Sequence, residues 1–332
     1  MPSDSASELA SPPTGGSAQR AEANTRAARV DEWLALQRSF AFALASEDAA
    51  PVWLERFTKT AARIRELTAQ DADIALYMML QSATHDLEQY SARHALFCGV
   101  VADLCAVQEG WSDDEAAALR HAALTMNIGM RAVQDEMARQ AGPLTDAQRV
   151  LIENHPKAGV ELLQAAGVAD PLWLEIVRRH HQPVDDGEAS DPPSAPQRLA
   201  QLLHRIDVFT AKLSRRRTRP GSTATVAARD ACLDASGLPD PTGATLLRVL
   251  GLYPPGSFVR LANGEIGIVI RRGEKAHTPQ VACVRSIDGS LVANPVLRET
   301  ARAGHAIQRS LSPNDVRTRL DHVKVVGATI GS

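Results

Sequence analysis

The chain has 332 residues, of which 44% are hydrophobic and 4% aromatic, and its formal net charge is −3. That length is sufficient to bury a sizeable core in one large domain or one and a half. The weak net charge argues against binding to DNA or to a membrane surface, and no apolar run is long enough to span a bilayer.

The N-terminal segment divides into two parts by composition. Residues 1–28 are rich in Ser, Ala, Pro and Gly and nearly free of large apolar groups, so we expect a disordered tail. No basic start precedes an apolar run, which argues against a signal peptide. From residue 29 to 71, apolar residues recur at three- and four-residue steps, which predicts a helical arm for sensing or for forming a homodimer.

Residues 72–253 continue the helical period and predict the main helical domain. A single long helix is expected from about residue 73 to 107. Further on, Thr145 and Gln148 have the form of a capping box, which marks the start of a helix. Proline disrupts a helix interior, so that helix is expected to stop before Pro156, where a new one begins.

The composition changes after residue 253 and predicts a small sheet over residues 254–300. Two alternating apolar segments are interrupted, one by an Asn-Gly pair at 263–264 and one by an Asp-Gly pair at 288–289. Such pairs are strong signals for a hairpin. The predicted fold class is therefore a mostly α-helical bundle with a small C-terminal antiparallel β appendix, followed by a tail over 301–332.

Five polar side chains lie in segments otherwise suited to burial: His94, His155, His180, His181 and Asp207. A single histidine on an apolar face is more often a satisfied core residue than a ligand. A buried carboxylate is costly unless it is paired or bound to a metal. Taken together, on successive helices, the five residues match a metal-ligand shell in a helical bundle.

The order of these residues resembles the HD-GYP family, a branch of the HD-domain phosphohydrolases. The motifs that carry the resemblance are YSARH (90–94), ENHPKAG (153–159), HH (180–181) and RID (205–207). The segment YPPGSFVRLANGEIGIVI also resembles the β appendix found at the end of many such domains. The resemblance covers roughly residues 72–300.

This resemblance implies an HD-domain-like bundle in a bacterial, cytoplasmic protein of cyclic di-GMP signalling. Active members of the family hydrolyse cyclic di-GMP and hold two or three metal ions, often iron or manganese. By resemblance, His94 and Asp207 belong to one ion, whereas His155, His180 and His181 belong chiefly to its neighbour.

The chain departs from the family pattern at the centre of the expected site. Met126 and Asn127 stand where the family has its His-Asp pair, and Met130 stands where a lysine would meet phosphate. The Gly-Tyr-Pro loop is missing from residues 183–196. A neutral amide bridges two cations poorly, and a thioether is a soft ligand for iron(II) or manganese. The first ion is therefore expected to be absent or loosely held, and no catalytic set is intact.

A second ion remains possible on the other three histidines. Three neutral imidazoles with an open position suit zinc or iron, so the expected cofactor is one divalent ion (iron, manganese or zinc) or none. Adjacent residues in a helix diverge by about 100°. His180 and His181 can therefore meet one ion only if Pro183 unwinds the end of their helix.

Two further sets of residues have alternative interpretations. Arg215, Arg216 and Arg217 form either a solvated basic turn at a helix C-terminus or a clamp for a phosphate-bearing ligand. The four cysteines contain no CxxC pair and are expected to be small buried hydrophobes in a reducing compartment: Cys98, Cys105, Cys232 and Cys283.

Three hypotheses of function remain open at this point. The first is a degenerate HD-GYP protein that acts by binding a cyclic dinucleotide or a signalling protein. The second is an active phosphohydrolase with a non-standard metal site. The third is a structural or interaction module without metal.

Overall fold

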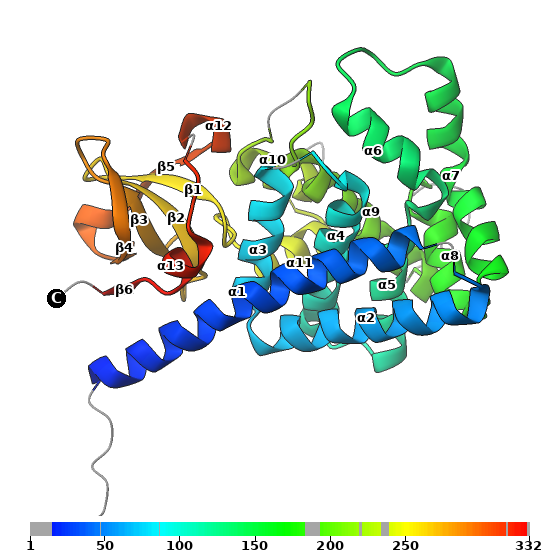
Figure 1. Ribbon diagram of the computed structural model, residues 1–332, viewed down its shortest axis with the longest axis horizontal. Coiled ribbons are helices and arrows are strands. Elements are labelled where there is room, and N and C mark those ends of the chain that lie inside the picture. Colours follow the sequence, from blue (N-terminus) through cyan, green and yellow to red (C-terminus); the bar gives the residue numbers. More distant parts are fainter. Residues whose placement is uncertain are drawn as a thin grey trace, which may run out of the picture.

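The structure is a computed structural model. It describes residues 15–46, 48–85, 87–182, 193–218, 221–233, 239–316 and 318–330. A helical part and a small sheet lie side by side, and the long N-terminal helix runs along both (Figure 1). The predicted fold class is confirmed: a mostly α-helical protein with a small, largely antiparallel C-terminal sheet.

The helical part comes first along the chain. Its α-helices are α1 (Gly15–Ala45), α2 (Ala50–Gln70), α3 (Ala72–His85), α4 (Tyr90–Glu109), α5 (Asp113–Thr125), α6 (Arg131–Arg139), α7 (Asp146–Ala165), α8 (Pro171–Arg179), α9 (Ala195–Leu213), α10 (Ala224–Cys232) and α11 (Pro241–Leu250). One 3-10 turn, η1 (Ile128–Met130), connects α5 to α6. No helix in the described ranges combines the length and apolar content needed to cross a membrane.

Helix α4 is the central element of the helical part. Almost its whole length is buried, and it packs against α2, α3, α5 and α9. Aromatic stacking links two other helices: the Phe57 ring of α2 lies between Trp53, at 5.1 Å, and Trp173 of α8, at 5.4 Å between centroids. Burial of such a side chain contributes about 1.5–3 kcal/mol, so this stack fixes α8 and the histidines that follow it.

The sheet has the strand order β5-β1-β2-β3-β4-β6. Its strands are β1 (Phe258–Leu261), β2 (Ile266–Arg271), β3 (Gln280–Arg285), β4 (Leu291–Glu299), β5 (Ile307–Leu311) and β6 (Thr329–Ile330). Both predicted hairpins form, with Gly264 and Gly289 at φ values of 93° and 83° that favour glycine. The sheet continues past residue 300, because β5 pairs with β1 and the short β6 adds in parallel to β4.

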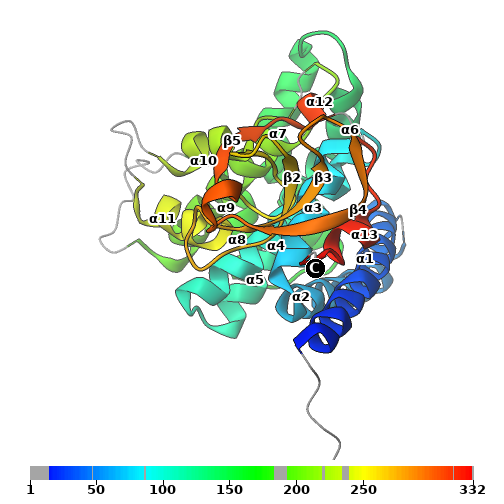
Figure 2. The ribbon, with the colours of Figure 1, turned by 90° about the vertical axis from the view of Figure 1, so that its left-hand side faces the viewer.

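Three short elements accompany these strands. They are η2 (Ala303–His305), α12 (Pro313–Val316) and α13 (His322–Val326). Helix α13 packs on α1 and on strands β3 and β4, and Figure 2 shows α13 between the sheet and α1. The tail predicted over 301–332 is thus largely part of the folded appendix.

The N-terminal helix starts earlier than predicted. Residues 1–14 lie outside the described residues, but 15–28, expected as part of a disordered tail, belong to α1. This segment is rich in Ala, Arg and Glu, which have high helix propensity. The Arg26 guanidinium also anchors it, since it pairs with Asp71 at 3.2 Å and donates a hydrogen bond to the Ile270 carbonyl of β2.

Two predicted helix boundaries are wrong. The expected single helix over 73–107 is broken before α4, where Gln89 takes a left-handed backbone conformation with φ of 52°. Conversely, α7 does not stop before Pro156 but continues through it to Ala165. The reason for the second difference lies in the chemistry of the preceding histidine.

Candidate metal centre

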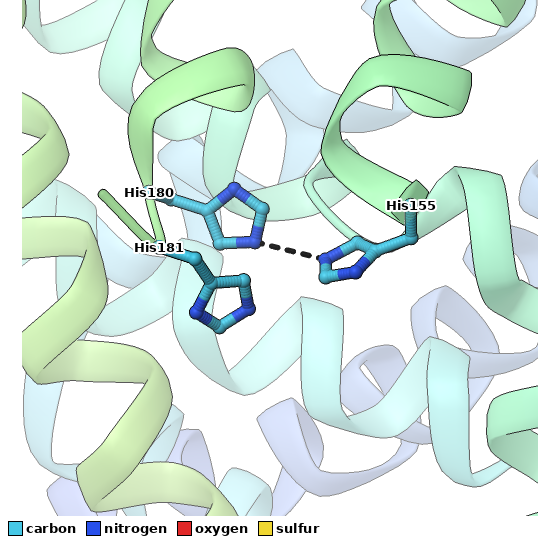
Figure 3. A group of neighbouring side chains, drawn as sticks. All are labelled: His155, His180 and His181. Atoms are coloured by element: carbon cyan, nitrogen blue, oxygen red, sulfur yellow. Dashed lines mark hydrogen bonds between the residues drawn. The ribbon is translucent and has the colours of Figure 1, made fainter. Parts of the chain in front are cut away.

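Three histidines from two helices meet at one point. His155 lies within α7, whereas His180 and His181 follow the end of α8. Figure 3 shows the His155 ring facing the pair, with its Nε2 3.1 Å from Nε2 of His180. The His181 ring centroid lies 5.1 Å from that of His155 and 4.2 Å from that of His180. His155 and His180 are buried and His181 is exposed, so the group lies at the edge of the interior.

Pro156 explains how His155 is oriented. In a regular helix, the N–H of residue 156 would bond to the carbonyl of Ile152, but proline has no N–H to donate. The freed Ile152 carbonyl accepts a hydrogen bond from Nδ1 of His155 instead. Because a carbonyl can only accept, Nδ1 carries the proton and Nε2 is left with its lone pair. The proline therefore sets the tautomer of the histidine without ending the helix.

His180 is oriented in the same way by the end of a helix. Helix α8 finishes at Arg179, and the last carbonyls of a helix lack partners within it. The Val177 carbonyl accepts a hydrogen bond of 2.7 Å from Nδ1 of His180. His180 keeps a helical backbone conformation as the C-cap of α8, and a turn follows it, yet the rings of both His180 and His181 lie 5.1 Å from that of His155. Pro183, predicted to cause this end, lies outside the described residues.

The electrostatics of the group favour a cation. Burial lowers the pKa of His155 to about 4 and that of His180 to about 3, and burial lowers the pKa of His181 as well. All three rings are therefore neutral at pH 7. Two Nε2 lone pairs then face each other at 3.1 Å with no proton between them, which is unfavourable unless a cation accepts both.

The residues fit a divalent ion in both geometry and donor type. Imidazole nitrogens bind zinc at about 2.0–2.1 Å, so two of them on one ion lie within about 4.2 Å of each other. The Nε2 atoms of His155 and His180 meet this limit at 3.1 Å, and the ligand atoms of all three histidines lie within 4.8 Å of one another. The carbonyls of Ile152 and Val177 supply the outer hydrogen bonds that typically orient metal-binding imidazoles.

A second group of polar residues lies between α4 and α9. Nε2 of His94 is 2.7 Å from Oδ1 of Asp207, and Sγ of Cys98 lies 3.7 Å from the same nitrogen. The Cys98 sulfur also lies 3.1 Å from the Thr210 hydroxyl. His94 and Cys98 are four residues apart, so they occupy one face of α4.

This second group is an ion pair rather than a set of neutral ligands. Burial opposes a charge on His94, but Cys98 and the hydrogen bond to Asp207 raise its pKa well above the usual 6.5. Burial likewise opposes charge on Asp207, yet the His94 contact holds the pKa of this carboxyl below its usual range. Nδ1 of His94 is buried and has no hydrogen-bond partner in the described part of the chain, unlike the Nδ1 atoms of the three-histidine group.

Asp207 connects the two groups electrostatically. Its carboxylate raises the pKa of His155, His180 and His181 against the larger lowering caused by burial. The carboxylate therefore pairs with His94 and also lies close enough to the three histidines to affect their pKa values. The structure brings together all five residues expected as ligands, in two adjoining groups.

Met126 and Asn127 lie where α5 ends, and both are buried. The segment that contains them packs closely on α7: a Cβ on Gly129 would come within 2.5 Å of the His155 carbonyl. Met130 is nearly buried as well. Apolar thioethers and a neutral amide thus occupy the segment that faces the helix of His155.

Only one of the three predicted arginines approaches these groups. The Arg216 guanidinium lies 5.4 Å from the ring centroid of Tyr90, and the Tyr90 ring stacks on His94 at 5.8 Å. Arg215 and Arg217 are exposed, and their backbone N–H groups bond to carbonyls of α3 and α6. A phosphate-binding role for these arginines stays a prediction, with Arg216 best placed for it.

Sequence reasoning missed three neighbours of the candidate ligands. Cys98 was interpreted as a small hydrophobe, although its spacing of four from His94 was a usable signal. His204 was not among the candidate ligands, and its ring lies 5.8 Å from that of His181. Tyr90 was noted only as part of the YSARH motif. All four cysteines are buried and unpaired, as expected.

Two curated proteins are similar to this chain. It is 29% identical over 189 residues to the cyclic di-GMP phosphodiesterase PA4108 of Pseudomonas aeruginosa, across 55% of this chain and 45% of that protein. It is 31% identical over 119 residues to the cyclic di-GMP phosphodiesterase response regulator RpfG of Xanthomonas campestris, across 35% of this chain and 32% of that protein. Both similarities support the resemblance inferred from the motif order. The chain aligns with less than half the length of either relative. No family model matches the chain, and no solved structure matches it significantly.

Proposed function

We propose that this chain is a degenerate HD-GYP-type protein of cyclic di-GMP signalling that binds a ligand or partner and hydrolyses cyclic di-GMP weakly or not at all. One observation carries the proposal. The three neutral imidazoles of His155, His180 and His181 keep a geometry suited to an ion, whereas Met126 and Asn127 offer poor ligands to a neighbouring one. The two cyclic di-GMP phosphodiesterases support the choice of signalling system.

The proposed cofactor is one divalent ion, namely iron, manganese or zinc. His155 and His180 would hold it through Nε2, and His181 through one of its two ring nitrogens. When bound, a divalent ion supplies a Lewis acid and makes a bound water more acidic. The carbonyls of Ile152 and Val177 keep the two buried rings in the tautomer that can bind it.

Weak hydrolysis follows from the residues of the neighbouring group. Phosphodiester hydrolysis in two-metal sites needs two cations close together to stabilise the entering and leaving oxygens. In place of a second cation, the charge of Asp207 is matched here by the imidazolium of His94, at 2.7 Å. Met130 offers no charge for a phosphate. Ligand binding is expected to suffer less than turnover, because Arg216 and the three histidines remain.

One observation favours a second candidate, a phosphodiesterase that works with a single ion. Asp207 is held as a carboxylate and lies near all three histidines. A carboxylate there can accept a hydrogen bond from a water at the site and orient it, whereas its lowered pKa makes it a weak base. A third possibility, a structural module without metal, is separated from both by metal analysis of the purified protein.

Turnover of cyclic di-GMP tests the proposal. Loss of one electrostatic contributor to a transition state costs about 2.7–4 kcal/mol, or about 100- to 1,000-fold in rate. The purified protein, supplied with iron(II) or manganese, is expected to show at most a trace of hydrolysis. Repair of the pair by Met126→His with Asn127→Asp is expected to raise the metal content above one ion per chain. Turnover by the unmodified protein at about 1 per second or faster establishes the single-ion enzyme instead.

A further inference from the structure

A pocket of about 770 Å³ lies apart from both histidine groups. It is formed by α2, the second half of α4 and the start of α5, and it is closed by Val249 of α11 and by Arg272 after β2. Small-molecule sites commonly have volumes of about 300–1,000 Å³. None of the candidate metal ligands lines this pocket, so the proposed function does not account for it.

A buried ion pair lines the pocket. Nη1 of Arg120 donates a hydrogen bond of 2.6 Å to Oδ1 of Asp103, and both side chains are more than nine-tenths buried. Oδ2 of Asp103 and Nε of Arg120 are also buried, but have no hydrogen-bond partner among the described residues. Leaving a buried charged group half satisfied is costly, so this acceptor and this donor, on two residues that line the pocket, would gain from a polar ligand group.

The open side of the pocket carries a more available charge. Arg65 is 58% exposed and pairs with Asp113, which is 92% exposed. Such an exposed pair is worth about 0–1 kcal/mol, so an anion can displace the carboxylate. A guanidinium binds a phosphate group through two parallel hydrogen bonds. Arg272, in contrast, is already engaged with Asp73 and the Val249 carbonyl.

Apolar groups complete the wall. Trp111 lines the pocket, and the Arg198 guanidinium lies 5.1 Å from its ring centroid, which fixes the indole in place. Val107, also on the wall, is 81% exposed, an unusual exposure for a branched aliphatic side chain beside a polar floor. Together these side chains suit a flat, largely apolar ring.

We propose that this pocket binds a purine nucleotide. The purine ring would lie against Trp111 and Val107, its phosphate would bind Arg65, and its edge would pair with Asp103 and Arg120. Both guanine and adenine present an N–H donor next to an acceptor on the edge of the ring, which matches one free carboxylate oxygen and one free guanidinium N–H. The pocket is separate from the histidine groups, so the proposal of nucleotide binding does not depend on whether the protein hydrolyses cyclic di-GMP weakly.

Calorimetric titration of the full chain tests the proposal with four probes: GMP, AMP, ribose 5-phosphate and inorganic phosphate. At least one purine nucleotide is expected to bind with a Kd of about 100 µM or tighter, and at least tenfold more tightly than ribose 5-phosphate. A preference for GMP or for AMP identifies the base. Equal binding of ribose 5-phosphate, binding of phosphate alone, or no binding of either nucleotide overturns the proposal.

Two matched pairs of exposed positions on α2 locate the site. Arg65→Ala is expected to raise the Kd at least about tenfold, the equivalent of 1.4 kcal/mol, whereas Arg63→Ala, two residues away and outside the pocket, leaves it unchanged. Ala69→Trp fills the pocket and abolishes binding, whereas Ala62→Trp on the exposed face does not. If His155→Ala still binds the nucleotide, this site is separate from the metal centre. If His155→Ala loses nucleotide binding and Arg65→Ala keeps it, the assignment is overturned.

Discussion

The two histidine groups lie side by side and use the same side chain in opposite charge states. His155 and His180 are neutral, with each Nδ1 held by a backbone carbonyl and each Nε2 lone pair directed toward the other. His94 is paired with a carboxylate, and its Nδ1 has no partner in the described part of the chain. The first group is arranged to receive a cation, whereas the second already contains its own positive charge.

On the proposed degenerate interpretation, this contrast illustrates what a substitution at a metal centre leaves behind. A buried carboxylate needs a nearby positive charge. With Met126 and Asn127 in the segment that faces α7, Asp207 obtains this charge from the imidazolium of His94. A group of this kind stabilises the fold but competes with a metal, because the ion would have to displace a proton. Family motifs alone do not distinguish the two groups, since both contain a histidine expected as a ligand.

Substitutions in the two histidine groups are expected to differ most in their effect on the free energy of unfolding. His94→Ala removes the partner of a carboxylate that is only 17% exposed, and it is expected to lower the free energy of unfolding by about 3–5 kcal/mol. His180→Ala, in the metal-free protein, removes an equally buried imidazole together with the unfavourable contact of two lone pairs, so less than half that loss is expected. Urea denaturation of both variants in the presence of a chelator measures the difference. Similar losses at the two positions would show that His94 and Asp207 are not an ion pair.

The next largest difference is expected in metal binding. His155→Ala or His180→Ala is expected to weaken cobalt(II) binding by more than about 100-fold, since even loss of an outer partner of a ligand costs about 10- to 100-fold. Cys98→Ala is expected to leave the affinity unchanged. The absorption spectrum provides an independent measurement, because a cobalt–thiolate bond gives a strong near-ultraviolet band. Such a band that disappears in Cys98→Ala, but not in the control Cys105→Ala, would place the ion in the other group.

The sequence was sufficient to predict the fold and to single out five polar side chains that the structure brings together, because both depend on periodic patterns. Helical spacing, two Xaa-Gly hairpin signals and the order of the histidines all carried over to the structure. The break before α4 could not be predicted, since Gln89 takes a positive φ without the glycine that usually marks one. At Gln89 the local sequence signal for a helix break was absent.

The errors at the site have a different physical origin. Pro156 was interpreted as a helix end from its missing N–H, but the same missing N–H frees the carbonyl that binds the side chain of His155. Cys98 was interpreted as apolar, although its spacing from His94 was a usable signal, because residue type alone does not show that its sulfur lies 3.1 Å from the Thr210 hydroxyl. Both errors concern hydrogen bonds between a side chain and atoms brought together by folding, which residue type alone does not specify.

The two groups also differ in how their contribution to stability depends on pH, and the sign is opposite. The folded pKa values of about 4 for His155 and about 3 for His180 lie below the ordinary 6.5. A group with a lowered pKa is compatible with the fold above the unfolded pKa and costs stability as pH falls toward the folded value. The pKa of His94 is raised, so its contribution is complete below about 6.5 and is lost as pH rises through the raised value.

The metal-free protein is therefore expected to lose stability on acidification from about pH 6.5 to 4 through the three-histidine group. Urea midpoints measured at intervals over this range test the sign, and the double variant His155→Gln with His180→Gln is the control. Glutamine does not titrate, so the variant should show a weaker pH dependence than the parent protein. A bound divalent ion should also protect the parent protein, because it stabilises the neutral rings against protonation. If the urea midpoint of the double variant depends on pH as steeply as that of the parent protein, the rings are not neutral. The argument that their facing lone pairs require a cation would then fail as well.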